Sequence, residues 1–215
     1  ICALGGNDSI RAYDGDDIVH RGSGDDQVLA YAGDDILYGG PGNDSLFGYP
    51  GADILYGGPG NDSLSLVDSG WAYGEDGDDH ISGSHEADIL YGGPGNDRIT
   101  ARWGDDTLIG GHGHDELLGG KGNDLVKGQA GNDEIIGGVG RDRLKGGDGR
   151  DTIRGGPGQD VLSGHKGLDK LHGDKGNDRL LAKDGKRDSL WGGPGYDRAK
   201  WDWRDKVTSV EKRLR

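Results

Sequence analysis

The sequence predicts an all-β protein: a parallel β-roll in which two sheets of short strands form one solenoid. Two observations support this fold class. The ten residues LYGGPGNDSL occur at 37–46 and again, unchanged, at 55–64. Nearly the whole chain also divides into nine-residue units of the form G-G-x-G-x-D-x-U-x, where U is apolar, and the two copies are displaced by two such units. A short fixed period of this kind is the sequence signature of a solenoid built from one repeated element.

The composition excludes several other classes of protein. Of the 215 residues, 47 are Gly and only 31% are hydrophobic, which is too few for one conventional core of this length. Such a composition by itself suggests disorder, but regular spacing argues against it, because repeat architectures bury small apolar sets by stacking. The chain has no apolar run as long as a membrane-spanning helix, so we predict no membrane span. Cys2 is the single cysteine, which excludes a disulfide scaffold.

Each nine-residue unit combines one turn and one strand. Gly at positions 1, 2 and 4 permits positive φ, so the first six positions form a turn. Positions 7 to 9 alternate polar, apolar, polar, which predicts a very short strand with one inward side chain. Two units then complete an 18-residue coil. We expect the roll to cover residues 1–200, with a truncated first coil at 1–2 and a degenerate repeat at 66–73, and a C-terminal cap at 201–215.

Position 6 is Asp in 21 units, and the two-unit coil places these Asp residues in two columns. The first column contains Asp8, Asp26, Asp44, Asp62, Asp79, Asp97, Asp115, Asp133, Asp151, Asp169 and Asp188, and the second contains Asp17, Asp35, Asp53, Asp88, Asp106, Asp124, Asp142, Asp160, Asp178 and Asp197. Carboxylates about 5 Å apart, the spacing of stacked strands, repel each other. A hard cation between successive turns relieves this repulsion. Ca²⁺ accepts carboxylate and carbonyl oxygens in flexible geometry, whereas soft metals favour Cys or His, which the motif lacks. We therefore predict several Ca²⁺ ions as cofactors.

Over about residues 3–200 the units GGPGNDSLF (39–47), GGHGHDELL (110–118) and GGKGNDLVK (119–127) resemble the hemolysin-type calcium-binding (RTX) repeat family. The chain is also similar to secreted actinobacterial-type repeat proteins. The resemblance implies a β-roll with Ca²⁺ between consecutive turns on both edges, held by the Asp columns and backbone carbonyls. It also implies export in an unfolded state, followed by folding outside the cell when the chain meets Ca²⁺. Binding energy would then be folding energy.

We accordingly expect a calcium-binding repeat protein that is secreted or at the cell surface and serves as a structural, surface or adhesive module. One alternative is a C-terminal fragment of a larger secreted RTX enzyme or toxin, and another is an extracellular protein that self-assembles into dimers or filaments. The sequence contains neither HExxH nor GxSxG, so we predict no enzymatic activity. The glycine-rich turns lack the long helix of a phosphate loop, and we expect no specific nucleic-acid partner. Ice binding is not favoured, because a regular Thr/Asn ladder is absent.

Three departures from the repeat predict local differences. Gly70 occupies the place of an Asp, which predicts a missing or weakened Ca²⁺ site there. At the unit 183–191 the spacing before Asp188 is one residue longer than in the other units, which predicts a bulged turn. Glu86 replaces a turn Gly; either the turn tolerates the side chain or Glu86 reaches the metal, and we favour tolerance. In the tail, Trp201, Trp203, Val207, Val210 and Leu214 are candidates to cover the last coil.

Two surface features suggest partners. Outward strand positions on the sheet of the second column form an aliphatic and aromatic stripe, whereas the opposite sheet is more polar. The predicted interface residues are Ile36, Tyr38, Ile54, Tyr56, Trp71, Tyr73, Ile89 and Tyr91. A contiguous apolar stripe marks interfaces, although cross-strand stabilisation also explains it. Residues 1–140 contain 6 Lys/Arg and 26 Asp/Glu, whereas residues 141–215 contain 19 and 13. The basic C-terminal end is therefore a candidate site for an anionic surface polymer.

Overall fold

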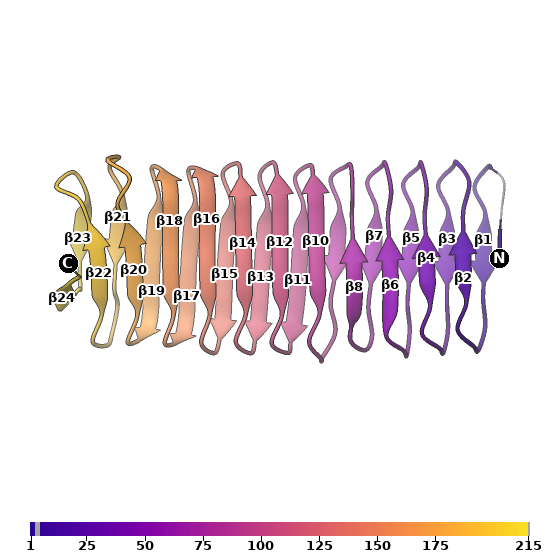
Figure 1. Cartoon of the computed structure of the whole chain (residues 1–215), viewed down its shortest axis with the longest axis horizontal. Helices are drawn as coiled ribbons and strands as arrows, with labels where there is room; N and C mark the ends of the chain where they lie inside the picture. Colours follow the sequence, from indigo (N-terminus) through magenta and orange to yellow (C-terminus); the bar gives the residue numbers. More distant parts are fainter. Residues whose placement is uncertain (3–4, 215) are drawn as a thin grey trace.

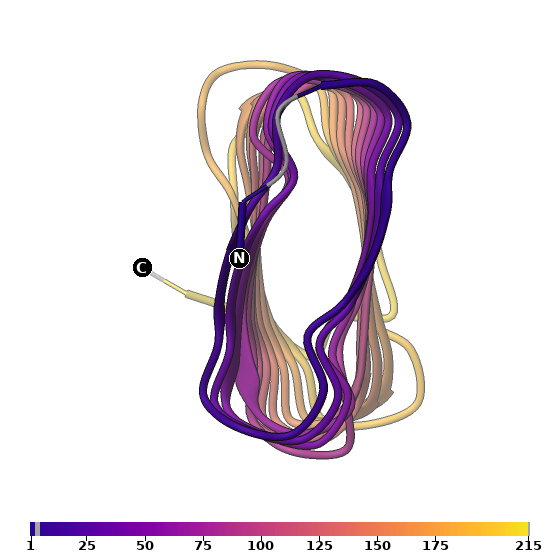
Figure 2. The same cartoon turned by 90° about the vertical axis from the view of Figure 1, so that its right-hand side faces the viewer.

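The chain winds into a stack of flat coils along one axis. The computed structural model describes residues 1–2 and 5–214. Within these residues all regular structure is β-strand, arranged in two twelve-stranded sheets, and every strand pairs in parallel with the strand one coil away. Figure 1 shows the coils following one another along a rod from the N-terminus to the C-terminus. Figure 2 looks along the rod and shows each coil as a flattened loop with a sheet on either long side.

The odd-numbered strands form the first sheet and the even-numbered strands form the second. The first sheet contains β1 (Ser9–Arg11), β3 (Gln27–Leu29), β5 (Ser45–Phe47), β7 (Ser63–Ser65), β9 (His80–Ser82), β11 (Arg98–Trp103), β13 (Glu116–Lys121), β15 (Glu134–Val139), β17 (Thr152–Gly158), β19 (Lys170–Gly176), β21 (Ser189–Trp191) and β23 (Lys206–Thr208). The second contains β2 (Ile18–His20), β4 (Ile36–Tyr38), β6 (Asp53–Tyr56), β8 (Gly70–Tyr73), β10 (Ile89–Pro94), β12 (Thr107–His112), β14 (Leu125–Ala130), β16 (Arg143–Gly149), β18 (Val161–Gly167), β20 (Arg179–Ala182), β22 (Arg198–Trp201) and β24 (Lys212–Arg213).

The register confirms the predicted 18-residue coil. Leu37 pairs with Leu55 in the second sheet, so the two copies of the opening decapeptide lie directly against each other. The spacing shortens where β6 pairs with β8, because the segment before Gly70 is one residue short. It lengthens where β19 pairs with β21. Each irregularity is confined to a turn, since the strands on both sides keep their pairing.

The core is a double row of inward apolar side chains, one row from each sheet. Leu37 and Leu55 of the second sheet and Leu46 and Leu64 of the first are buried with at most 1% of their surface exposed. Their strand neighbours face outward because successive side chains in a strand point to opposite faces. Position 8 of the motif is therefore apolar because its side chain points into the core. Among the described residues there is no helix of the length and hydropathy that a membrane span needs.

The turns require glycine because successive coils approach closely. At position 4, Gly60 has a φ of +146°, and a Cβ there would lie 1.8 Å from the carbonyl oxygen of Gly42 in the preceding coil. At position 1 the space is also narrow, since a Cβ on Gly39 would lie 2.6 Å from Oδ2 of Asp44 and 2.4 Å from the carbonyl oxygen of Gly57, although Ala30 and Ala101 occupy this position in other turns. Position 2 is more permissive, since Tyr31 has a positive φ there without being glycine.

The tail continues the roll beyond residue 200. Strands β23 and β24 add one further strand to each sheet. Trp201, Val207 and Val210 pack against the core. Trp203 does not, since 84% of its surface is exposed, and the expectation that it covers the last coil is wrong. The guanidinium of the next residue, Arg204, lies over the exposed Trp203 ring, 4.9 Å from the ring centroid.

Candidate metal centre

The motif aspartates form a hydrogen-bonded ladder along each edge of the roll. We call the edge that carries the first Asp column the first edge, and the edge that carries the second column the second edge. On the first edge, the backbone N–H of Asp26 donates to Oδ1 of Asp44 at 2.7 Å, and that of Asp44 donates to Oδ1 of Asp62 at 2.7 Å. On the second edge, Asp35 donates to Asp53 in the same way at 2.9 Å. The structure therefore brings together the carboxyls that sequence spacing placed in columns.

The second carboxylate oxygen of these residues is buried without a partner. In the part of the chain that the structure describes, Oδ2 accepts no hydrogen bond in Asp26, Asp35, Asp44, Asp53, Asp62, Asp79, Asp97, Asp106, Asp115, Asp124, Asp133, Asp142, Asp151, Asp160, Asp169, Asp178, Asp188 and Asp197. A buried polar atom without a partner is costly, and a buried unpaired charge is more so. A repeated orphan atom of one kind indicates a ligand rather than isolated defects.

Burial changes the acidity of these carboxyls. Burial, with a smaller contribution from the negative charges of neighbouring residues, raises the pKa of Asp62 and Asp115 from 3.8 to about 7, against the lowering effect of the backbone hydrogen bond that each carboxyl accepts. A shift of this size means that ionising the carboxyl costs about 4 kcal/mol more in the folded chain than in the unfolded chain. Because a whole domain is stable by only about 5–15 kcal/mol, a few ionised carboxyls without a counter-charge would unfold the roll at neutral pH. The ladder therefore needs protons or cations.

The donor set fits a hard divalent cation. The described residues contain no group of three or more His, Cys, Asp and Glu side chains close enough to hold a metal, so carboxylates supply only part of any coordination shell. Backbone carbonyl oxygens are available for the remaining positions. For example, the carbonyl oxygen of Gly57 and Oδ2 of Asp44 both lie within 2.6 Å of the point where a side chain on Gly39 would begin. All of these donors are oxygen atoms, which is the ligand type that Ca²⁺ selects. The residues present therefore fit the predicted cofactor.

The second edge is interrupted at two successive coils. Gly70 provides no carboxyl, as the sequence showed. In the next turn, Oδ2 of Asp88 accepts hydrogen bonds from the backbone N–H of Ser84 at 2.7 Å and from its hydroxyl at 3.0 Å. Asp88 thus differs from the buried aspartates of the second column, because both of its carboxylate oxygens accept hydrogen bonds from protein atoms. Glu86 lies in the same turn with an exposed side chain, which agrees with the tolerance we favoured.

Sequence reasoning missed two acidic residues that extend the ladders. On the first edge, the N–H of Asp188 donates to Oδ1 of Asp205 at 3.0 Å. On the second edge, the N–H of Asp197 donates to Oε2 of Glu211 at 2.5 Å. A signal for Asp205 was present, since Asp205 and Val207 keep the spacing of the motif Asp and its apolar residue. Glu211 had no such signal, because glutamate does not occur at this position elsewhere.

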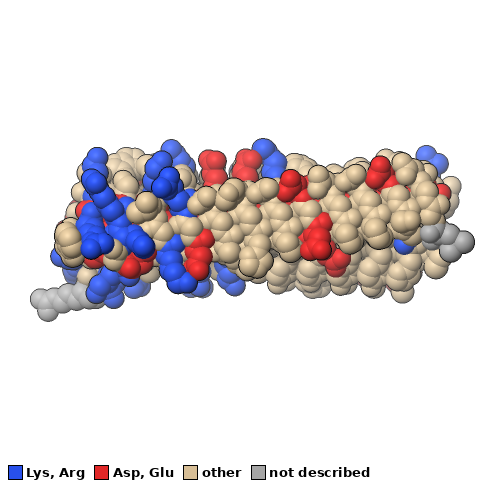
Figure 3. Space-filling view, turned by 90° about the horizontal axis from the view of Figure 1, so that it is seen from above, with Lys and Arg blue, Asp and Glu red and all other residues tan. Residues whose placement is uncertain are grey.

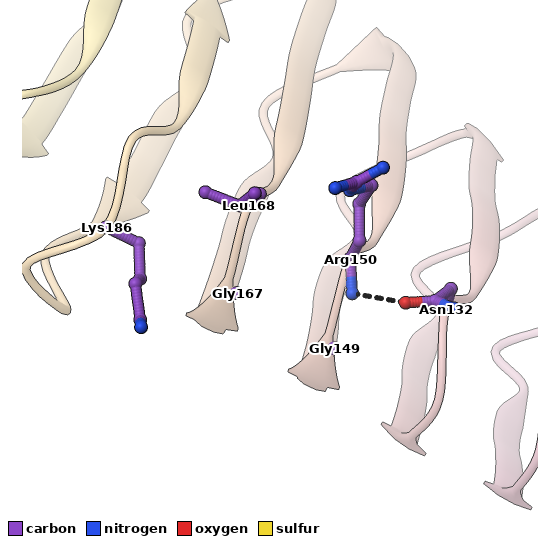
Figure 4. A pocket seen from close by; sticks show the side chains of 6 residues that line it. All are labelled: Asn132, Gly149, Arg150, Gly167, Leu168 and Lys186. Atoms are coloured by element: carbon purple, nitrogen blue, oxygen red, sulfur yellow. Dashed lines mark hydrogen bonds between the residues drawn. The ribbon is translucent and has the colours of Figure 1, made fainter.

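A second ladder, also missed from sequence, runs along the outside of the turns through position 5. The N–H of Asn61 donates to Oδ1 of Asn43 at 2.9 Å. Figure 4 shows the same bond from the N–H of Arg150 to Oδ1 of Asn132 at 2.8 Å, within an open hollow that Lys186 also lines. The signal was the Asn or Asp that usually precedes the motif Asp. This outer ladder joins coils without a metal, because every bond in it is between protein atoms.

The predicted interface residues lie on the second sheet and stack across its strands. The rings of Tyr38, Tyr56, Tyr73 and Tyr91 are parallel within 9°, with centroids 4.9–5.0 Å apart. Most of this stripe is half-buried by its own neighbours, although Trp71 keeps 40% of its surface exposed. The stripe therefore stabilises the sheet through stacking as well as offering an apolar surface.

The fold and the carboxylate ladders define the class of parallel β-solenoids whose turns are closed by cations. Within this class the chain belongs to the family of RTX calcium-binding nonapeptide repeats. The model of that family matches residues 3–28, 29–64, 73–108, 86–117, 109–144, 145–180 and 169–199. Membership implies multiple bound Ca²⁺ ions. The matches omit residues 65–72, which include the turn where Gly70 replaces Asp.

Among solved structures, the chain is similar to a hyperactive, Ca²⁺-dependent, β-helical antifreeze protein from an Antarctic bacterium. The similarity covers 94% of this chain and 80% of that one, with a TM-score of 0.50 and 18% sequence identity. At this identity the likeness concerns the fold. No curated protein sequence matches the chain.

Proposed function

We propose that Ca²⁺ binding along the two Asp columns drives folding of the roll, with the 21 motif aspartates as ligands, of which Asp88 contributes least because Ser84 already satisfies its Oδ2. The orphan Oδ2 atoms carry this proposal, because they repeat on both edges and are buried among oxygen donors. Bound ions would supply the positive charge that the ladder requires. The binding free energy would then contribute directly to folding, while the 47 glycines make the unfolded chain entropically favourable without it.

Far-UV circular dichroism during a Ca²⁺ titration tests this proposal, with Mg²⁺ as the control. We expect a cooperative change from coil to β-structure with Ca²⁺ alone, since Mg²⁺ demands stricter octahedral geometry and retains its waters. A full β spectrum in resin-depleted, Ca²⁺-free buffer at pH 8 would show that the core and the outer ladder suffice. The Asp columns would then need another explanation.

We further propose a non-catalytic role outside the cell or at its surface, as a structural or adhesive module. Family membership supports this setting, and sites of extracellular modules are tuned to about 10⁻⁴–10⁻³ M Ca²⁺. A measured Ca²⁺ midpoint far below this range would argue for a different compartment. The alternative, a fragment of a secreted enzyme or toxin, predicts a much larger mass for the protein purified from its source.

The apolar stripe supports a proposal of self-association through the second sheet. Ile54 and Trp71 are outward neighbours in adjacent strands and extend the tyrosine stack into one continuous surface. Sedimentation velocity with Ca²⁺ present tests it. We expect Ile54→Lys to reduce association, while Ser63→Lys, at the same strand position on the opposite sheet, leaves it unchanged. Equal behaviour of both variants and of the wild type would remove the stripe as an interface.

The basic end supports a proposal of binding to an anionic surface polymer. Figure 3 shows Lys and Arg side chains gathered over the C-terminal part of the rod. One groove there is lined by Lys166, Arg179, Lys183 and Lys200, with Asp184 as its acidic member. Retention on immobilised heparin, measured as the eluting salt concentration, tests the surface. Arg179→Gln with Lys200→Gln should elute earlier than Arg98→Gln with Lys121→Gln, which removes equal charge elsewhere.

A further inference from the structure

Arg21 lies in a place where the neighbouring turns have no side chain. It occupies position 1 of the first-edge turn 21–26, and the next turn has Gly39 at this position. A side chain on Gly39 would collide with Oδ2 of Asp44 and with the following coil. The Arg21 side chain nevertheless enters its turn completely, with 0% of its surface exposed. A buried arginine is rare unless it is paired.

The backbone around Arg21 is undisturbed. Its N–H donates to the carbonyl of Tyr38 at 3.1 Å, just as the N–H of Gly39 donates to the carbonyl of Tyr56 at 2.8 Å. The guanidinium is therefore held inside a turn of ordinary pairing. Its burial therefore does not disrupt the backbone hydrogen bonds between the coils.

The guanidinium contacts oxygen atoms of its own coil, while Oδ2 of Asp26 and Nε of Arg21 have no hydrogen-bond partner among the described residues. Nη1 lies 3.3 Å from Oδ1 of Asp26, and Nη2 donates to the carbonyl oxygen of Gln27. The same positive charge lowers the pKa of Asp44 against the stronger effect of burial, which raises it. The guanidinium thus places a buried positive charge against the Asp26 carboxyl, and Asp26 is joined to the next coil by the bond from its N–H to Oδ1 of Asp44.

We propose that Arg21 takes the place of one Ca²⁺ ion, between the turns 21–26 and 39–44 on the first edge. The proposal rests on the proposed calcium function. Two cations would compete for the same buried carboxylates and repel each other in a region of low dielectric. An arginine also stays charged at every relevant pH. This level of the roll is therefore neutralised by the chain itself and closes without metal.

Counting bound ions tests the substitution. Equilibrium dialysis at saturating Ca²⁺, followed by elemental analysis, gives the number of ions per chain. We expect Arg21→Gly, which restores the motif glycine, to bind one more Ca²⁺ than the wild type. Arg21→Ala should do the same, and Ala30 and Ala101 show that position 1 tolerates alanine in this fold. Arg102→Gly, which removes an exposed arginine from another turn, should leave the count unchanged.

The outcomes separate the two proposals. If the wild type binds several ions and both Arg21 variants fold and bind the same number, Arg21 does not replace an ion. If neither the wild type nor the variants bind Ca²⁺, the calcium function itself fails. Hydrogen exchange provides a second readout in the wild type. At a Ca²⁺ concentration below the folding midpoint, amides of turn 21–26 should exchange more slowly than those of turn 110–115, which has no internal cation.

Discussion

Oδ2 of Asp88 accepts two hydrogen bonds from Ser84, one from its backbone N–H and one from its hydroxyl. In the other turns of the second edge from Asp35 to Asp197, the corresponding oxygen has no protein partner where the motif Asp is present. Ser84 thus replaces part of what a cation would provide. Together with Gly70 in the preceding coil, it divides the second edge into two ladders of unpaired carboxylates.

Asp88→Asn should therefore weaken Ca²⁺-driven folding less than Asp124→Asn does. Both residues belong to the second edge, but Oδ2 of Asp124 lacks a protein partner. We expect Asp124→Asn to raise the Ca²⁺ midpoint about tenfold, equivalent to about 1.4 kcal/mol, and Asp88→Asn to raise it by much less. Midpoints come from circular dichroism titrations at pH 7.5. Equal shifts would mean that Ser84 does not satisfy Asp88 in solution.

Replacing the missing carboxylate directly should fail. A Cβ on Gly70 would lie 2.5 Å from the carbonyl oxygen of Asp53 and 2.9 Å from Cδ2 of Leu66, which is fully buried. Gly70→Asp is therefore expected to reduce stability by about 1–3 kcal/mol through overpacking, without adding a bound ion. Urea unfolding and ion counting measure these effects. Ser69→Asp in the same turn controls for added charge, and an ion gained by Gly70→Asp would contradict the steric argument.

Close approach of coils favours glycine at position 4, where Glu86 is an exception. Gly60→Ala would place Cβ 1.8 Å from the carbonyl oxygen of Gly42, whereas Gly15→Ala would meet nothing within 4 Å. Both glycines have positive φ, so both substitutions carry backbone strain of about 1–3 kcal/mol. We expect Gly60→Ala to lose clearly more free energy of unfolding in urea at saturating Ca²⁺. Losses of the same size would show that strain alone, and not the coil contact, selects glycine.

The stability of the metal-free fold should fall as the pH rises, whereas the affinity for Ca²⁺ should increase as the pH rises. Burial raises the pKa of Asp151 to about 7 and that of Asp97 to about 6, from 3.8. Protonation therefore favours the metal-free fold, whose stability is greatest near pH 4 and falls as the pH rises towards 7. Ca²⁺ binding instead displaces protons and weakens on acidification.

Circular dichroism of the resin-depleted protein measures the first effect, and Ca²⁺ midpoints at pH 5.5 and pH 8 measure the second. We expect more β-structure without Ca²⁺ at pH 5 than at pH 8, and a higher Ca²⁺ midpoint at pH 5.5. A metal-free spectrum that does not change between pH 5 and pH 8 would show that the buried carboxyls do not control folding.

Much of the fold and most of the candidate metal centre followed from sequence periodicity. The spacing from Asp44 to Asp62 predicted the coil length, because stacking repeats the same environment at each coil. The inward row of Leu46 and Leu64 followed from strand alternation. Where the period changes, at Gly70 and in the unit 183–191, sequence located the irregular turns but did not show how their atoms are arranged.

The sequence by itself determined the architecture, the two Asp columns and the choice of an oxygen-ligated cation, because these depend on a repeated pattern of residue types. Only the tertiary structure decided which carboxylate oxygens remain unpaired. It showed that Ser84 satisfies Asp88, that Leu66 fills the space beside Gly70 and that the Arg21 guanidinium enters its turn. These outcomes depend on side-chain directions and on contacts between successive coils, which a motif that averages over all units does not contain.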